Sequence, residues 1–302
     1  MNYYSDPQKL YTEALCYLRN DEVASYHKRV IVMLKALVRE PRDEQKIIML
    51  FNWLNDLAHK YNHKKEHTKA LRILNIMLKL CPTNPITHNN LGVVYLELGK
   101  LGLAEKVALK AYQLAPQNDK YLDFLFLIKS MQGKYSEILN ESIELINKHP
   151  IRALYRTWYG YALQRLNRNE EAIEALKCSI ALDNKDTTAR VILAESYKKS
   201  GQLTEAIEVC KEAHKVNPQE TGIIEMLGCA YGRMNDYESA EKTFAKALEQ
   251  DPYSEYAARG LLLALNKQGK LSDELFNEYK KNINTFCQIR AIENDMKGGE
   301  KQ

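Results

Sequence analysis

Apolar and small residues recur along this chain with a period of 34 residues. Leucine occupies one place of the period in six copies, at Leu57, Leu91, Leu125, Leu193, Leu227 and Leu261. Alanine occupies another place in five copies, at Ala70, Ala104, Ala172, Ala206 and Ala240. Small residues let two helices cross closely, and large residues fill the gaps beside them. The pattern therefore predicts pairs of packed helices that are copied in tandem.

Proline, glycine and asparagine mark the expected ends of the helices. Proline stops a helix, and it recurs in the same register at Pro82, Pro116, Pro150, Pro218 and Pro252. Glycine lets the first helix of a pair end and the chain reverse, at Gly99, Gly133, Gly201 and Gly269. Asn167 replaces glycine in one unit and also tolerates left-handed geometry. We expect helix-turn-helix units to start at residues 51, 85, 119, 153, 187, 221 and 255.

The unit that starts at Asp119 departs most from this pattern. It carries Phe126, Ile138 and Leu145 at places where the other units prefer small residues. Large side chains at a close crossing force two helices apart. The helices of this unit are therefore expected to pack more loosely or in a shifted arrangement.

The N-terminal part is predicted to be helical but irregular. Amphipathic helices are expected from about Pro7 to Arg19 and from about Glu22 to Arg39. Asp43 is expected to cap a long apolar helix that runs to about Tyr61. We interpret residues 1–50 as an N-terminal cap or a degenerate repeat.

The C-terminal part is predicted to close the array. An apolar stripe indicates an amphipathic capping helix, formed by Leu275, Tyr279, Ile283, Phe286 and Ile289. The repeat array is therefore assigned to residues 51–288, and a helix end with a frayed tail to residues 289–302.

These features resemble the tetratricopeptide repeat (TPR) family, whose pattern combines a small residue and a tyrosine three places apart with a later alanine and a proline. The matching pairs here are Gly92 with Tyr95, Ala194 with Tyr197, and Gly228 with Tyr231. The resemblance implies an all-α, right-handed superhelical solenoid of about six and a half repeats with N- and C-terminal capping helices. It also implies that the first helix of each unit lines a concave groove.

The resemblance further implies which side chains face that groove. One group is apolar and aromatic: Val93, Leu96, Phe124, Leu127, Trp158 and Tyr161. The other is a basic row: Arg165, Lys199, Arg233 and Lys267. The first group either anchors a peptide or helix, or, at Phe124 and Trp158, fills gaps left by the divergent unit. The basic row either attracts an acidic partner or is a solvated face.

Two known binding modes of the family do not match this sequence. The carboxylate clamp of chaperone-binding members needs an asparagine at the ninth place of a unit, and Phe124 stands where the clamp needs arginine. The ninth places hold no asparagine: His59, Val93, Leu127, Tyr161, Glu195, Cys229 and Leu263. The asparagine ladder of sugar-transferase members is also missing from the sixth places, where only Asn90 occurs.

The sequence offers little for catalysis, cofactors or metals. It contains no phosphate-binding glycine loop, nucleophile elbow or zinc-protease motif. His59, His63 and His67 are spaced by four, but His67 is expected beyond the helix end, and the neighbouring Lys60 and Lys64 would repel a cation. We expect no enzymatic activity, no cofactor and no metal.

Composition narrows the classes of partner and the cellular compartment that we expect for this protein. The 302 residues are 45% hydrophobic and carry a net charge of +4, less basic than nucleic-acid binders usually are. The six cysteines form no C-x-x-C pair, which favours reduced thiols in the cytoplasm. The start shows no secretory signal, and no apolar run is long enough to insert in a membrane.

The expected function is that of a cytosolic adaptor or scaffold. Its partner would be a protein or peptide with apolar anchors, and with an acidic flank if the basic row takes part. Two alternatives are a secretion-type chaperone for a hydrophobic client and a peptide-controlled regulator that acts through its N-terminal helices. RNA binding is disfavoured because the aromatic residues do not alternate with the basic row. The aromatic group would also suit self-association into a homo-oligomer.

Overall fold

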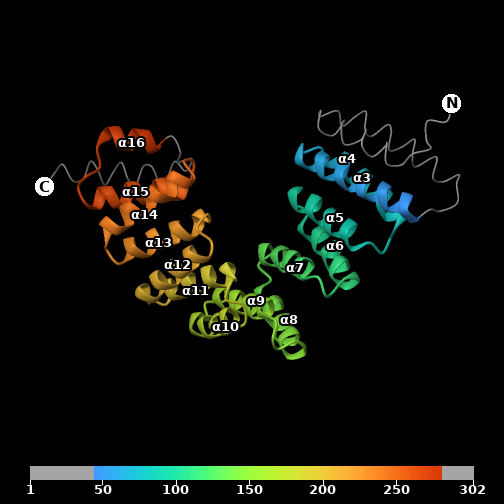
Figure 1. The fold of residues 1–302 in the computed structure, drawn as a ribbon, viewed down its shortest axis with the longest axis horizontal. Helices are drawn as coiled ribbons and strands as arrows, with labels where there is room; N and C mark the ends of the chain where they lie inside the picture. Colours follow the sequence, from blue (N-terminus) through green and yellow to red (C-terminus); the bar gives the residue numbers. More distant parts are fainter. Residues whose placement is uncertain (1–43, 281–302) are drawn as a thin grey trace. The chain divides into compact units, whose positions relative to one another are not determined.

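A computed structural model describes residues 44–280 of the chain, and every element in this range is a helix (Figure 1). The helices are α3 (Glu44–His63), α4 (His67–Leu80), α5 (Pro85–Glu97), α6 (Leu101–Leu114), α7 (Asp119–Met131), α8 (Tyr135–Lys148), α9 (Ala153–Arg165), α10 (Asn169–Leu182), α11 (Thr187–Lys199), α12 (Leu203–Val216), α13 (Thr221–Arg233), α14 (Tyr237–Gln250), α15 (Glu255–Lys267) and α16 (Asp273–Lys280). The all-α prediction is confirmed. The two helices expected before residue 40, the C-terminal stripe beyond Lys280 and the tail lie outside the described residues.

The chain divides into two compact units between Lys134 and Tyr135. The described part of the first unit holds α3 to α7, and that of the second holds α8 to α16. In each unit every helix packs on the next one along the chain. The boundary falls inside the divergent helix pair that starts at Asp119, since α7 belongs to one unit and α8 to the other.

Six first helices begin at residues where the 34-residue period starts a unit, and polar caps explain several of these starts. The side chains of Asn84, Asn118, Asp186 and Ser254 each accept a hydrogen bond from a backbone N–H in the first turn of the helix that follows. An N-cap of this kind satisfies a donor that the helix itself leaves unpaired. Local sequence therefore sets where these helices begin.

The chain reverses within each pair through one residue in the left-handed region. Gly99, for example, has φ +70°, a conformation without steric cost only for glycine. Asn167 adopts φ +61°, which confirms the expectation that asparagine replaces glycine in that turn. Asn235 and Lys65 take the same conformation in two further turns.

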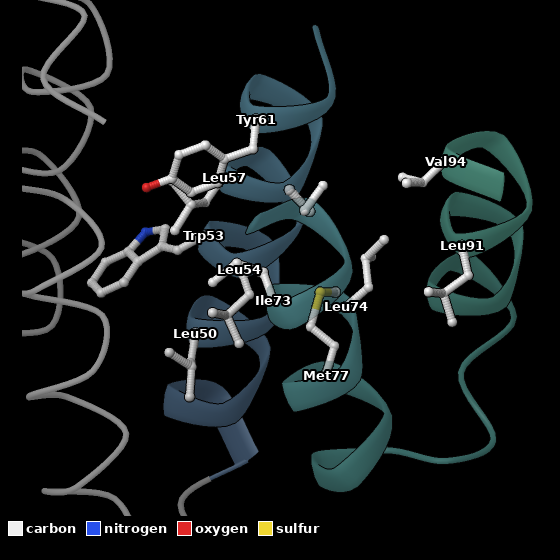
Figure 2. Close-up of a cluster of buried hydrophobic side chains, with 12 residues drawn as sticks. Leu50, Trp53, Leu54, Leu57, Tyr61, Ile73, Leu74, Met77, Leu91 and Val94 are labelled. Carbon is white, nitrogen blue, oxygen red and sulfur yellow. The ribbon is translucent and has the colours of Figure 1, made fainter. Parts of the chain in front are cut away.

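One apolar cluster in the core of the first unit is built by α3, α4 and α5 (Figure 2). Leu54, Leu57 and Leu74 have no exposed surface. In Figure 2, Leu91 and Val94 point from α5 toward α4, whose Leu74 and Met77 belong to the same cluster. The small residues expected at the crossings are buried here too, since Ala70, Ala104 and Ala111 are fully buried.

The core of the second unit also buries small residues where its helices cross. Its repeating alanines are almost completely buried: Ala172, Ala206, Ala213, Ala240 and Ala247. Around Phe244 of α14, which is 4% exposed, residues of α13, α15 and α16 form one apolar cluster. The close crossings predicted from the alanine pattern are therefore present in both units.

Within residues 44–280 no helix has both the length and the apolar character needed to cross a membrane.

Cys210 lies in the core of the second unit. It is 2% exposed, and burial raises the pKa of its thiol to about 12.

Because the thiolate is the reactive form of cysteine, we expect iodoacetamide at about pH 8 to modify exposed Cys178 and to spare Cys210 in the folded protein. Peptide mass mapping with and without urea measures this, and rapid modification of Cys210 without urea would contradict it.

Candidate functional site

The first helices of successive pairs form a row in each unit. Helix α5 contacts α3 and α7 in the first unit, and α9, α11, α13 and α15 contact one another in order in the second. The ten expected groove residues lie on these helices. Four of them, Val93, Leu96, Phe124 and Leu127, belong to the first unit, and the other six belong to the second.

In the first unit, Phe124 packs back on the preceding pair. A Cβ atom placed on Gly92 of α5 would lie 2.5 Å from Cε1 of the Phe124 ring, so the ring occupies space that the glycine leaves empty. This contact supports the gap-filling interpretation of Phe124. Leu127, in contrast, is 45% exposed.

Val93 lines a hollow of about 540 Å3 on the first unit, together with His59, Lys60, His63 and Lys64. His67 is not among the residues that line this hollow: it begins α4, and its Nδ1 is 3.0 Å from Oδ1 of Asn62, which does line it. Across the described residues, no three histidine, cysteine or carboxylate side chains gather as a metal site.

In the second unit the structure brings three expected residues together. The rings of Trp158 and Tyr161 on α9 meet edge to face, with centroids 5.5 Å apart and planes at 87°. Tyr161 in turn meets Tyr135 of α8 at 6.3 Å. The Arg165 guanidinium lies 4.8 Å from the Tyr135 ring centroid and donates a hydrogen bond of 2.7 Å to its hydroxyl oxygen. We call Tyr135, Trp158, Tyr161 and Arg165 the aromatic cluster.

Tyr135 was missed by the sequence reasoning because it begins a second helix, and only first helices were expected to line the groove. The sequence nevertheless contains a signal that distinguishes Tyr135. The place that begins the second helix carries tyrosine in only two units, at Tyr135 and Tyr237. Both tyrosines lie at hollows or clusters on the row of first helices.

The expected basic row does not form one continuous strip. Arg165 is engaged with Tyr135, whereas Lys199 is exposed. Lys198, next to it, pairs with Glu195 at 2.6 Å. Arg233 and Lys267 instead line one hollow of about 360 Å3 between α13 and α15, which we call the α13–α15 hollow.

Comparison with known proteins gives matches along much of the chain. The family model described as "Psidin, N-terminal TPR repeats region" matches residues 130–276, and the model described as "Tetratricopeptide repeat" matches residues 87–118.

Individual curated relatives match stretches of the chain at low identity. Phagocyte signaling-impaired protein of Drosophila pseudoobscura pseudoobscura is 28% identical over 124 residues, which are 41% of this chain and 13% of that protein. Anaphase-promoting complex subunit CDC16 of Saccharomyces cerevisiae is 23% identical over 184 residues, 58% of this chain and 22% of that protein. The chain thus matches less than a quarter of the length of each of these two relatives.

Solved structures agree in fold. A tetratricopeptide repeat protein from Parabacteroides merdae superposes with a TM-score of 0.61 at 15% identity, covering 86% of this chain and 98% of that one. The APC/C hetero-tetramer Cut9-Hcn1 gives a TM-score of 0.60 at 16% identity, covering 88% of this chain and 52% of that one. At such identities the likeness concerns the fold alone.

Proposed function

The chain belongs to the tetratricopeptide repeat family, and on that premise we propose that it is a non-enzymatic adaptor that holds a segment of a partner protein. A stack of helix pairs presents one row of first helices whose side chains do not have to close a core. Among the relatives, one is named as a subunit of the anaphase-promoting complex, and one similar fold was solved in a hetero-tetramer. These likenesses support a role in assembling proteins.

The observation that carries the proposal is the aromatic cluster. Trp158 and Tyr161 are only half-buried, although each is large and apolar enough for a core. Aromatic rings that touch edge to face keep a fixed orientation, and aromatic residues with arginine are the side chains that dominate binding energy at interfaces. We place the anchor of the partner segment on α9, with Arg165 oriented beside it by Tyr135.

We place this function in the cytosol. The four cysteines among the described residues are free thiols, Cys81, Cys178, Cys210 and Cys229, as a reducing compartment favours. The cytosolic location, the anchor and the absence of catalysis form one proposal.

Replacing Trp158 and Tyr161 together with alanine is expected to reduce capture of the partner by at least about tenfold, because each buried aromatic anchor contributes roughly 2 kcal/mol. Capture from a cytosolic extract, followed by quantitative mass spectrometry, measures the loss. The matched control is Tyr253→Ala, which removes an 83% exposed tyrosine from the same unit.

Circular dichroism of both variants must first show unchanged helix content, since the two rings also contact each other. Equal recovery of every captured protein by the double variant and by Tyr253→Ala would overturn the anchor. Recovery of only the chain itself would indicate self-association in place of an adaptor role.

A further inference from the structure

Three glycines open the α13–α15 hollow. The ring of Phe244, from α14, reaches beneath α13 and α15. A Cβ atom added to Gly228 would lie 2.9 Å from the nearest ring carbon, and one added to Gly260 would lie 2.3 Å from the ring carbon nearest to it. No larger residue fits at these two positions while the ring is there. At Gly232, in contrast, a Cβ atom would meet nothing within 4 Å. The space above Gly232 is therefore open, and Phe244 forms an apolar floor.

This hollow is particular to the last two complete pairs of the described chain. One unit earlier, the place of Gly232 carries Lys198 and the place of Gly260 carries Met226. Longer side chains at those places would occupy the space between neighbouring first helices. The glycines thus create a hollow that the general repeat pattern does not require.

The walls are apolar, and the charged lining residues are all basic. Leu263, Ala264 and Tyr256 contribute carbon surface, and the charges are Arg233, Arg259 and Lys267. No carboxylate is among the residues that line the hollow. Arg259 lies 5.2 Å from the Tyr256 ring centroid, and Arg233 donates a 3.3 Å hydrogen bond to the Lys198 carbonyl oxygen. These contacts hold two of the cations beside the apolar walls.

Tyr256 adds no negative charge to oppose these cations. Burial, together with a hydrogen bond with Cys229, raises the pKa of its phenol above the ordinary value. The phenol is therefore neutral at physiological pH, and the charged residues that line the hollow are the three bases.

We propose that the α13–α15 hollow is a second recognition site, which takes one apolar side chain of an acidic peptide segment while flanking carboxylates face Arg233, Arg259 and Lys267. This proposal rests on the proposed adaptor function and specifies the chemistry of a second part of the partner protein. The hollow of about 360 Å3 is near the lower end of ligand pockets. An apolar side chain covers the Phe244 floor, and the excess of positive charge selects carboxylates over neutral or basic flanks.

The first test fills the hollow without disturbing the core. Gly232→Leu adds a side chain where a Cβ atom has open space, and Gly222→Leu is its matched control. Both glycines lie on α13, both have no atom within 4 Å of an added Cβ, and only Gly232 lines the hollow. Both variants gain the same helix propensity, so a difference between them reports the hollow.

The probes are short fluorescein-labelled peptides, whose central residue is leucine, isoleucine, methionine or phenylalanine between aspartates. Matched peptides carry asparagine flanks or a central alanine. Fluorescence anisotropy with the full chain is expected to show about tenfold tighter binding of an aspartate-flanked apolar peptide than of its matched peptides. Gly232→Leu is expected to weaken that binding about tenfold, and Gly222→Leu to change it less than about twofold.

The second test reverses charge. Arg233→Glu with Lys267→Glu is expected to weaken the aspartate-flanked peptide about tenfold, with a smaller loss at high salt, because screening reduces the contribution of exposed charges. The control pair, Lys185→Glu with Lys215→Glu, makes the same change in net charge at exposed residues of the same unit. It is expected to have little effect.

Four results would overturn the proposal: no binding of any aspartate-flanked peptide, equal binding of the asparagine-flanked set, equal affinity of the two leucine variants, or tighter binding of a single-stranded RNA with the same number of charges. These outcomes are separate from failure of the adaptor function, which is read from partner capture by the Trp158 and Tyr161 variants.

Discussion

Replacing Phe244 with alanine is expected to lower the free energy of unfolding of the second unit by about 3–5 kcal/mol. The ring is 4% exposed and touches the backbone of two neighbouring first helices, at Gly228 and Gly260. Its removal leaves a cavity that the surrounding helices fill only in part. Urea denaturation followed by Trp158 fluorescence in a Trp53→Phe background measures the loss. Tyr253→Ala, at an exposed tyrosine, is the control and is expected to change stability by less than about 0.5 kcal/mol.

A double-mutant cycle sharpens this prediction. Gly260→Ala in the natural chain is expected to cost about 1–3 kcal/mol, because the new methyl group overlaps the Phe244 ring. In the Phe244→Ala background the overlap is gone, and the same change is expected to be neutral or stabilising by up to about 1 kcal/mol, since alanine favours a helix over glycine.

The double-mutant cycle tests whether the effect of Gly260→Ala on stability changes sign when the Phe244 ring is removed. Additive effects of the two substitutions would show that the ring and Gly260 do not interact, and would contradict the close approach on which the α13–α15 hollow depends.

Replacing Leu54 with alanine is expected to destabilise the first unit by about 2–5 kcal/mol. Leu54 has no exposed surface and lies in the cluster formed by α3, α4 and α5 (Figure 2). The matched control is Ile48→Ala on the same helix, where the side chain is 59% exposed. That change is expected to cost less than about 0.5 kcal/mol.

The chain provides its own reporter for each unit, since its two tryptophans are Trp53 in the first and Trp158 in the second. Trp53 is 3% exposed and belongs to the same cluster as Leu54. In a Trp158→Phe background its fluorescence in urea follows the first unit alone. A midpoint that falls as far for Ile48→Ala as for Leu54→Ala would contradict the prediction.

Much of the fold was predictable because its determinants are local. Asn84 and Asp186 accept hydrogen bonds from the first turns of α5 and α11, so the starts of those helices follow from short sequence. The left-handed turn at Asn167 follows in the same way. Ala104 and Ala206 recur where helices cross, and both are buried because a larger side chain would separate the helices.

The candidate sites were only partly predictable. The family pattern indicated Trp158, Tyr161, Arg233 and Lys267 as groove residues, and all four lie on first helices, but the pattern treated each side chain separately. It did not indicate that Tyr135 from a second helix joins the aromatic cluster. It also left two interpretations of Phe124 open, and the close approach of the ring to Gly92 supports gap filling.

The sequence by itself determined the period, the helix pairs, their caps and turns, and the small residues at their crossings, because each depends on neighbours within one unit of the repeat. Only the tertiary structure decided that the basic residues divide between a tyrosine contact and a hollow. That division depends on which side chains of neighbouring helices come together in the folded chain. Gly228, Gly232 and Gly260 leave room above Phe244, and this room forms the hollow. A missing side chain creates a binding surface only when its neighbours do not collapse into the space.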